Sequence, residues 1–103
     1  MNITVIGGGN IGTLMAAEAA NKGHNVTVYT SKPYKWGNSI DVYDSDDNLL
    51  IRGVMSKITD NMEAALKDAD YVWITVPAQV FPIIAKKMAP YVTSKQKIGI
   101  VPG

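Results

Sequence analysis

The chain has 103 residues, of which 47% are hydrophobic and 18% charged, a composition that predicts one folded domain and excludes an extended disordered tail. Ten Lys and Arg against nine Asp and Glu give a formal net charge of +1, so bulk charge indicates neither a nucleic acid nor an anionic membrane as partner. The lack of cysteine excludes disulfides and thiolate metal sites, and no apolar run approaches the roughly 20 residues of a membrane span. With no basic leader at the N-terminus, we expect a cytoplasmic protein.

The N-terminal third predicts a β-strand, an α-helix and a second β-strand. Residues 2–6 are rich in β-branched side chains without clean alternation, which favours a strand buried on both faces. Residues 10–22 are rich in Ala, Leu and Met and predict a helix that ends at Gly23. Residues 25–30 predict the second strand. A β-α-β unit of this kind forms a parallel strand pair with a right-handed crossover.

An irregular excursion follows the second strand. Residues 31–39 contain Pro33 and Gly37 and predict a loop. The runs 40–43 and 49–52 flank a polar stretch, which predicts a small hairpin.

The rest of the chain returns to the alternation of strands and helices. The expected elements are a strand at 57–59, a helix that begins at Asp60 or Asn61 and runs through Leu66, a strand at 71–76, a helix at 80–89 and a strand at 97–101. This alternation predicts an α/β fold over residues 1–103, a Rossmann-type doubly wound parallel sheet. We expect the strand order 3-2-1-4-5, with the hairpin as an excursion after the second strand.

A glycine-rich turn directly follows the first strand, where Gly7, Gly9 and Gly12 fit the pattern G-x-G-x-x-G. In that pattern the first glycine permits a tight turn, the second lets a pyrophosphate approach the backbone, and the third permits close helix–strand packing. The helix N-terminus directs unpaired N–H groups at the same place. Between a strand and a helix, the pattern predicts a dinucleotide site, in preference to a glycine turn without a ligand. No Gly-Lys-Ser/Thr follows, which excludes a mononucleotide P-loop.

The end of the second strand indicates which dinucleotide binds. An NAD-binding domain usually has Asp or Glu there to hold the ribose hydroxyls, whereas this chain has no acid between the end of the second strand and Asp41. Hydroxyl and ammonium groups bind a 2′-phosphate that a carboxylate would repel. The sequence therefore favours NADP(H) over NAD(H), and the 2′-phosphate pocket is predicted at Thr30, Ser31, Lys32 and Lys35. The alternative is a solvated loop whose lysines contact only water.

Three other features predict no catalytic or metal site. Residues 44–48 imitate the start of a calcium-binding loop, but the glycine and the final glutamate of that loop are missing. His24, the only histidine, lies in a predicted turn at the sheet edge opposite the glycine turn. Trp36 has two interpretations that remain open: it stacks on adenine, or it packs the loop onto the domain.

Three segments, residues 3–12, 23–28 and 69–78, resemble the N-terminal domains of opine (octopine/nopaline) dehydrogenases. Glycerol-3-phosphate dehydrogenases and ketopantoate reductases look similar over the same stretches. The hairpin region and residues 100–103 favour the opine group. The resemblance implies a domain of an NAD(P)-dependent enzyme that reductively condenses an amino acid with a 2-oxo acid.

The resemblance also implies roles for individual residues. It implies that Gly7, Gly9, Asn10 and Ile11 lie at the phosphates of the cofactor. It places Val76, Pro77 and Ala78 beside the ribose and adenosine. Residues 101–103 would lie toward the nicotinamide. The catalytic residues of that family lie in a second domain that this chain lacks, so we expect no catalytic residue here and cofactor binding without turnover. Pro82 stands where an uninterrupted early helix is expected.

Other interpretations of the chain remain. It is alternatively a stand-alone dinucleotide-sensing or regulatory module, or a domain that binds FAD or S-adenosylmethionine. We also expect the strand at 97–101 to form an uncapped sheet edge, which predicts a homo-oligomer.

Overall fold

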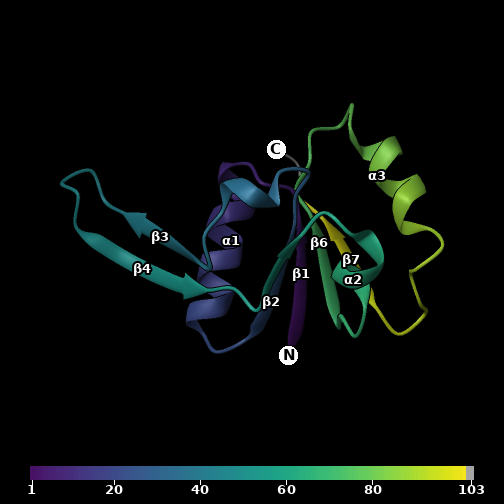
Figure 1. The fold of residues 1–103 in the computed structure, drawn as a ribbon, viewed down its shortest axis with the longest axis horizontal. Coiled ribbons are helices and arrows are strands. Elements are labelled where there is room, and N and C mark those ends of the chain that lie inside the picture. Colours follow the sequence, from purple (N-terminus) through teal and green to yellow (C-terminus); the bar gives the residue numbers. More distant parts are fainter. Residues whose placement is uncertain (102–103) are drawn as a thin grey trace.

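The computed structural model describes residues 1–101, and its centre is a five-stranded sheet in which every neighbouring pair of strands is parallel (Figure 1). The strands are β1 (Asn2–Ile6), β2 (Asn25–Tyr29), β5 (Lys57–Thr59), β6 (Tyr71–Ile74) and β7 (Lys97–Ile100). They stand in the order β5-β2-β1-β6-β7. Counted along the chain within this sheet, that is the order 3-2-1-4-5, so the predicted fold class is confirmed.

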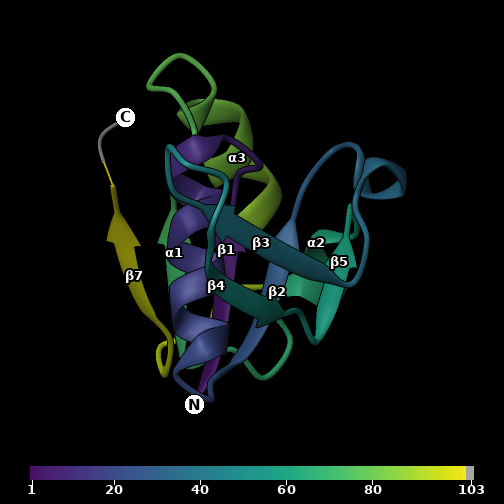
Figure 2. The same ribbon diagram turned by 90° about the vertical axis from the view of Figure 1, so that its left-hand side faces the viewer.

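The two faces of the sheet are covered by different elements. On one face lie α1 (Asn10–Asn21) and a hairpin of β3 (Ser39–Tyr43) and β4 (Leu49–Val54), which crosses α1 in Figure 2. On the other face lie α2 (Met62–Leu66) and α3 (Phe81–Met88).

Crossover handedness explains this division. The connections from β1 to β2 and from β2 to β5 move in one direction across the sheet, whereas those to β6 and β7 move in the other. Right-handed crossovers in opposite directions place their connecting elements on opposite faces. The hairpin therefore occupies the position where a crossover helix usually lies.

The alternation of β1 divides the apolar core into two clusters. Ile3 and Val5 pack with α1 and the hairpin, whereas Ile6 packs with α2 and α3. Thr4 points to the α2 side as well, where its hydroxyl donates to the Ala65 carbonyl oxygen at 2.6 Å. That carbonyl lies at the end of a helix, where no backbone N–H of the helix reaches it.

Most elements end within two residues of the expected position, and two differences bear on the site. The strand predicted to reach residue 76 ends at Ile74, and the predicted loop at 31–39 contains a 3-10 helix, η1 (Pro33–Lys35). Pro82 lies in the first turn of α3, where the N–H that proline lacks would have no helical partner, so it does not interrupt the helix. The longest helix in the described part of the chain has 12 residues, and none there has the length and apolar character of a membrane span.

Candidate functional site

The turn between β1 and α1 has glycines where side chains do not fit. Gly7 has a φ of +122°, a conformation that favours glycine. A Cβ atom on Gly12 would lie 2.6 Å from Thr75 Oγ1 and 2.7 Å from the Gly7 carbonyl oxygen. The Thr75 hydroxyl donates to the Ile6 carbonyl oxygen at 3.0 Å, and Gly7 N donates to the Tyr29 carbonyl oxygen at 3.0 Å. The turn is thus held between the ends of β6 and β2.

Gly9 has a different environment, because a Cβ on it would meet no atom within 4 Å. It is the N-cap residue of α1, and neither a side-chain cap nor an acid in the first turn occupies the helix N-terminus. The first N–H groups of a helix have no partner within the helix. The turn therefore presents backbone donors and the positive end of the helix dipole to open space, an arrangement that binds anions.

A cavity of about 250 Å³ adjoins this turn. Its wall comes from the glycine turn, the end of β2, the residue after Thr75 and one face of α3. The lining residues are Ile6, Gly7, Gly8, Tyr29, Thr30, Ser31, Val76, Val80, Ile83, Ile84 and Lys87. Apolar walls with a few polar groups are typical of a pocket for a small organic ligand.

The structure brings together part of the predicted site. Four predicted residues line the cavity: Gly7, Thr30, Ser31 and Val76. Four others form the adjoining turn and the start of α1: Gly9, Asn10, Ile11 and Gly12. The remaining four, Lys32, Lys35, Pro77 and Ala78, are exposed and lie outside the cavity wall. Val101 N donates to the Ile74 carbonyl oxygen at 2.8 Å, whereas residues 102 and 103, also predicted near the nicotinamide, lie outside the described residues.

Sequence reasoning missed the contribution of α3. The residues Val80, Ile83, Ile84 and Lys87 are spaced i, i+3, i+4 and i+7, so they share one side of the helix. This spacing was present in the sequence, but it alone does not show what the helix side faces. Thr75 was missed as well, since its contact with the glycine turn joins residues far apart in the chain.

Trp36 packs against the glycine turn. Its side chain is half-buried and contacts the core on the α1 face. A Cβ on Gly8 would lie 3.1 Å from Trp36 Cζ2 and 3.3 Å from Thr30 Oγ1. The structure therefore shows the packing interpretation of Trp36, and this indole joins the loop after β2 to the turn after β1.

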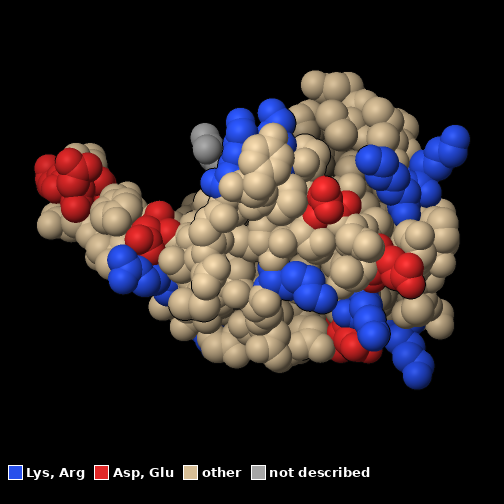
Figure 3. Space-filling view, in the orientation of Figure 1, with Lys and Arg blue, Asp and Glu red and all other residues tan. Residues whose placement is uncertain are grey.

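No acidic side chain lines the cavity among the described residues. The first acid after β2, Asp41, lies on β3 and accepts from Arg52 Nε and Nη2 at 2.8 and 3.0 Å. The hydrogen bonds from Arg52 lower the pKa of Asp41 below its usual value. Other carboxylates gather at the tip of the protruding hairpin (Figure 3). The cavity thus has no carboxylate to receive a ribose hydroxyl.

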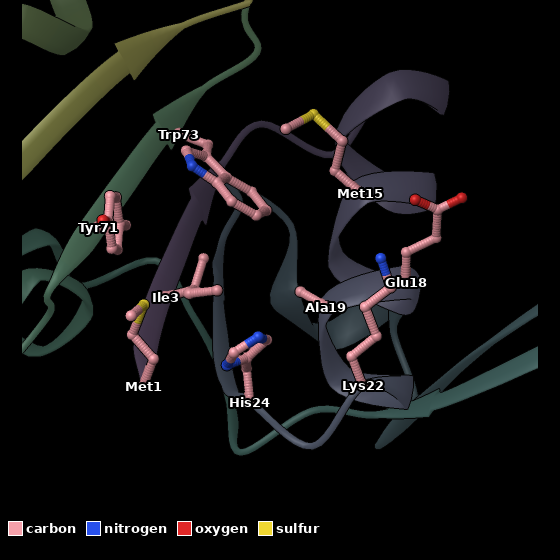
Figure 4. Close-up of a pocket in the computed structure, with 9 residues that line it drawn as sticks. All are labelled: Met1, Ile3, Met15, Glu18, Ala19, Lys22, His24, Tyr71 and Trp73. Carbon is pink, nitrogen blue, oxygen red and sulfur yellow. The ribbon is translucent and has the colours of Figure 1, made fainter.

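A second hollow, of about 430 Å³, lies beside α1 near the N-terminal ends of the strands (Figure 4). Its walls are mainly apolar and include Ile3, Met15 and Trp73, with His24 at the bottom of the view. It shares no lining residue with the cavity at the glycine turn. His24 therefore lies away from the candidate site, as the sequence predicts.

The family model and the related sequences that match this chain both point to glycerol-3-phosphate dehydrogenases. Residues 2–101 match the family described as the NAD-dependent glycerol-3-phosphate dehydrogenase N-terminus. A glycerol-3-phosphate dehydrogenase [NAD(P)+] of Acinetobacter baylyi is 25% identical over 107 residues, which is 100% of this chain and 29% of that protein. The enzyme of the same name from Clostridium botulinum is 31% identical, over 84% of this chain and 27% of that protein. The chain thus spans less than a third of these relatives.

Solved structures show the same fold. Octopine dehydrogenase with NADH and L-arginine superposes with a TM-score of 0.84 and 27% identity, over 98% of this chain and 28% of that one. A ketopantoate reductase from Ralstonia eutropha superposes with a TM-score of 0.77 and 17% identity, over 95% of this chain and 33% of that one. Yeast glycerol-3-phosphate dehydrogenase superposes with a TM-score of 0.65 and 17% identity, over 98% of this chain and 33% of that one.

Proposed function

The chain belongs to the family of the NAD-dependent glycerol-3-phosphate dehydrogenase N-terminus, and from this membership we propose that it is the dinucleotide-binding domain of an NAD(P)-dependent oxidoreductase. The observation that carries the proposal is the uncapped N-terminus of α1 at Gly9, which lies beside a mainly apolar cavity of about 250 Å³. The nicotinamide supplies the hydride chemistry when it is bound, while the domain binds and orients the cofactor. The domain alone then binds cofactor without turnover.

The pyrophosphate lies at the glycine turn in this proposal. Backbone N–H groups of Gly9, Asn10, Ile11 and Gly12 face the open end of α1 and donate to its oxygens. The lack of a side chain on Gly7 and on Gly12 also lets the turn lie close against Thr75. Val76 on the cavity wall, with Pro77 and Ala78 after it, borders the adenosine and its ribose.

We propose further that NADP(H) is preferred over NAD(H). Thr30 and Ser31, which carry hydroxyl groups, line the cavity, and Lys32 and Lys35 follow in and beside η1. These groups attract a 2′-phosphate, whereas none of the described wall residues has a carboxylate to hold a free 2′-hydroxyl.

Titration with NADPH and NADH side by side tests both parts of the proposal. We expect both nucleotides to bind the 103-residue chain, with the lower dissociation constant for NADPH; nicotinamide fluorescence measures both. If neither binds, or if native mass spectrometry shows retained FAD or S-adenosylmethionine instead, the proposal is wrong. Equal dissociation constants would contradict only the preference for NADP(H).

For the whole enzyme, we propose an opine dehydrogenase-like reaction, the condensation of an amino acid with a 2-oxo acid. The support is the TM-score of 0.84 with octopine dehydrogenase, against 0.65 with yeast glycerol-3-phosphate dehydrogenase. The family match and the relatives favour glycerol-3-phosphate oxidation as the second candidate. Assays of a longer protein that contains this domain separate them: pyruvate, an amino acid and NADPH for the first, glycerol 3-phosphate and NADP⁺ for the second. Turnover of neither would favour a regulatory module.

The edge strand β7 supports a proposal about assembly. Its outer edge has no neighbour in the described chain, and Ile98 and Ile100 are 44% and 61% exposed. An unpaired apolar edge readily adds a strand from another molecule. We expect the 103-residue chain to form dimers or larger species at high concentration, and sedimentation velocity would show them; monomers at all concentrations would contradict this.

A further inference from the structure

Lys87, on α3, has the only charged side chain on the wall of the cavity among the described residues. We propose that its ammonium group binds the 2′-phosphate of NADP(H) and is the main determinant of the preference for NADP(H) over NAD(H). This inference rests on the proposed function and names the residue that distinguishes the two cofactors.

The helix fixes where Lys87 stands. The apolar side of α3 faces the cavity with Val80, Ile83 and Ile84, and Ile84 is 7% exposed, which fixes the rotation of the helix against the sheet. Lys87 follows Ile83 and Ile84 by one turn and lies on the same side. A lysine in this position covers apolar wall with its methylene stem while its ammonium group reaches polar ligand atoms.

The cavity offers Lys87 suitable partners for a phosphate. Thr30 and Ser31 stand on the wall contributed by the end of β2. Thr30 Oγ1 accepts from Lys32 N at 3.2 Å, so the proton of its hydroxyl remains to donate. Two hydroxyls and one ammonium group are all donors, which suits an anion such as a 2′-phosphate. A free ribose hydroxyl would gain less from this set, because no carboxylate receives its proton.

The competing role for Lys87 is an ion pair on the protein surface. Lys87 also borders a neighbouring hollow that contains Asp60, Glu63 and Lys86. Within residues 1–101, no carboxylate oxygen lies within 4.0 Å of the Lys87 ammonium group. Lys86 lines this neighbouring hollow but not the cavity at the glycine turn. Because both lysines are exposed and lie on α3, Lys86 serves as a matched control.

The test measures dissociation constants of NADPH and NADH for the unsubstituted chain and for Lys87→Gln, Lys87→Arg, Lys86→Gln and Lys32→Gln. Lys87→Gln is expected to weaken NADPH binding roughly tenfold, the effect of losing one charge-assisted hydrogen bond, and to change NADH binding less than about twofold. Lys87→Arg keeps the preference. Lys86→Gln leaves both constants within about twofold, and Lys32→Gln has a smaller effect than Lys87→Gln, since all three lysines are exposed but only Lys87 lies on the cavity wall.

Adenosine 2′,5′-bisphosphate and AMP, which differ only in the 2′-phosphate, repeat the comparison without the nicotinamide half. The inference is overturned if Lys87→Gln weakens NADPH and NADH equally, or if Lys86→Gln or Lys32→Gln has the larger effect. If the unsubstituted chain binds neither nucleotide, the proposed function itself fails. If it prefers NADPH and Lys87→Gln keeps that preference, only the inference about Lys87 fails. Circular dichroism of each variant checks that the fold is retained.

Discussion

Gly12→Ala is expected to lower the free energy of unfolding by about 2 kcal/mol. The new Cβ would lie 2.6 Å from Thr75 Oγ1 and 2.7 Å from the Gly7 carbonyl oxygen, so backbone must move to admit it. Alanine gains up to about 1 kcal/mol of helix propensity over glycine, which offsets only part of this cost. Because a domain of this size is stable by about 5–15 kcal/mol, the loss is substantial. Urea denaturation measures it.

Gly37→Ala is the matched control for this stability measurement. A Cβ on Gly37 would meet no atom within 4 Å, and its φ is not in the positive range. We expect the free energy of unfolding of the Gly37→Ala variant to stay within about 0.5 kcal/mol of that of the unsubstituted chain. Equal denaturation midpoints for the Gly12 and Gly37 variants would show that the turn does not depend on close helix–strand packing.

Gly9→Ala is expected to weaken binding of NADPH and NADH alike by roughly a hundredfold while the domain stays folded. The new methyl group meets no protein atom, and the backbone of Gly9, with φ −79° and ψ −178°, is accessible to alanine. The weaker N-cap of alanine costs stability of about 1 kcal/mol or less. The methyl group instead projects into the space before α1, where the pyrophosphate needs direct access to backbone N–H groups.

Isothermal titration calorimetry measures the affinity of the Gly9 variant, and a thermal melt its stability. Gly37→Ala again serves as the control and is expected to bind normally. Unchanged affinity in the Gly9 variant would place the pyrophosphate elsewhere and contradict the proposed site. Comparison with Gly12→Ala then assigns different roles to two glycines of one motif, since one serves packing and the other serves access of the ligand.

The fold could be predicted because its signals are local. Apolar runs of four to six residues and the Ala-rich segment after the glycine turn determine strands and helices within a few residues of chain, and the doubly wound fold that their alternation indicates has a known strand order. The ends of elements were less predictable. Apolar character continues through Val76, but the strand ends at Ile74, where the Thr75 hydroxyl bonds to the end of β1.

The candidate site was predictable only where one segment encodes it. The three glycines carry their spacing within six residues, whereas the wall that α3 contributes depends on which side of the helix the tertiary fold turns toward β2. Lysines 32 and 35 illustrate the reverse case. Their proximity to the end of β2 in sequence predicts a place in the pocket, whereas in the structure both lysines are exposed and neither lines the cavity.

The central position of β1 has a consequence for folding during synthesis. Within this domain β1 is made before both of its neighbours, and one of them, β6, follows about 70 residues later; in the folded chain Asn2 N donates to the Asp70 carboxylate across that separation. Until Ile74 has left the ribosome, the nascent β-α-β unit carries an open strand edge and an uncovered Ile6. Non-local pairing of this kind slows folding and exposes intermediates to aggregation. The strand that supports the glycine turn therefore completes its pairing late in translation of this domain.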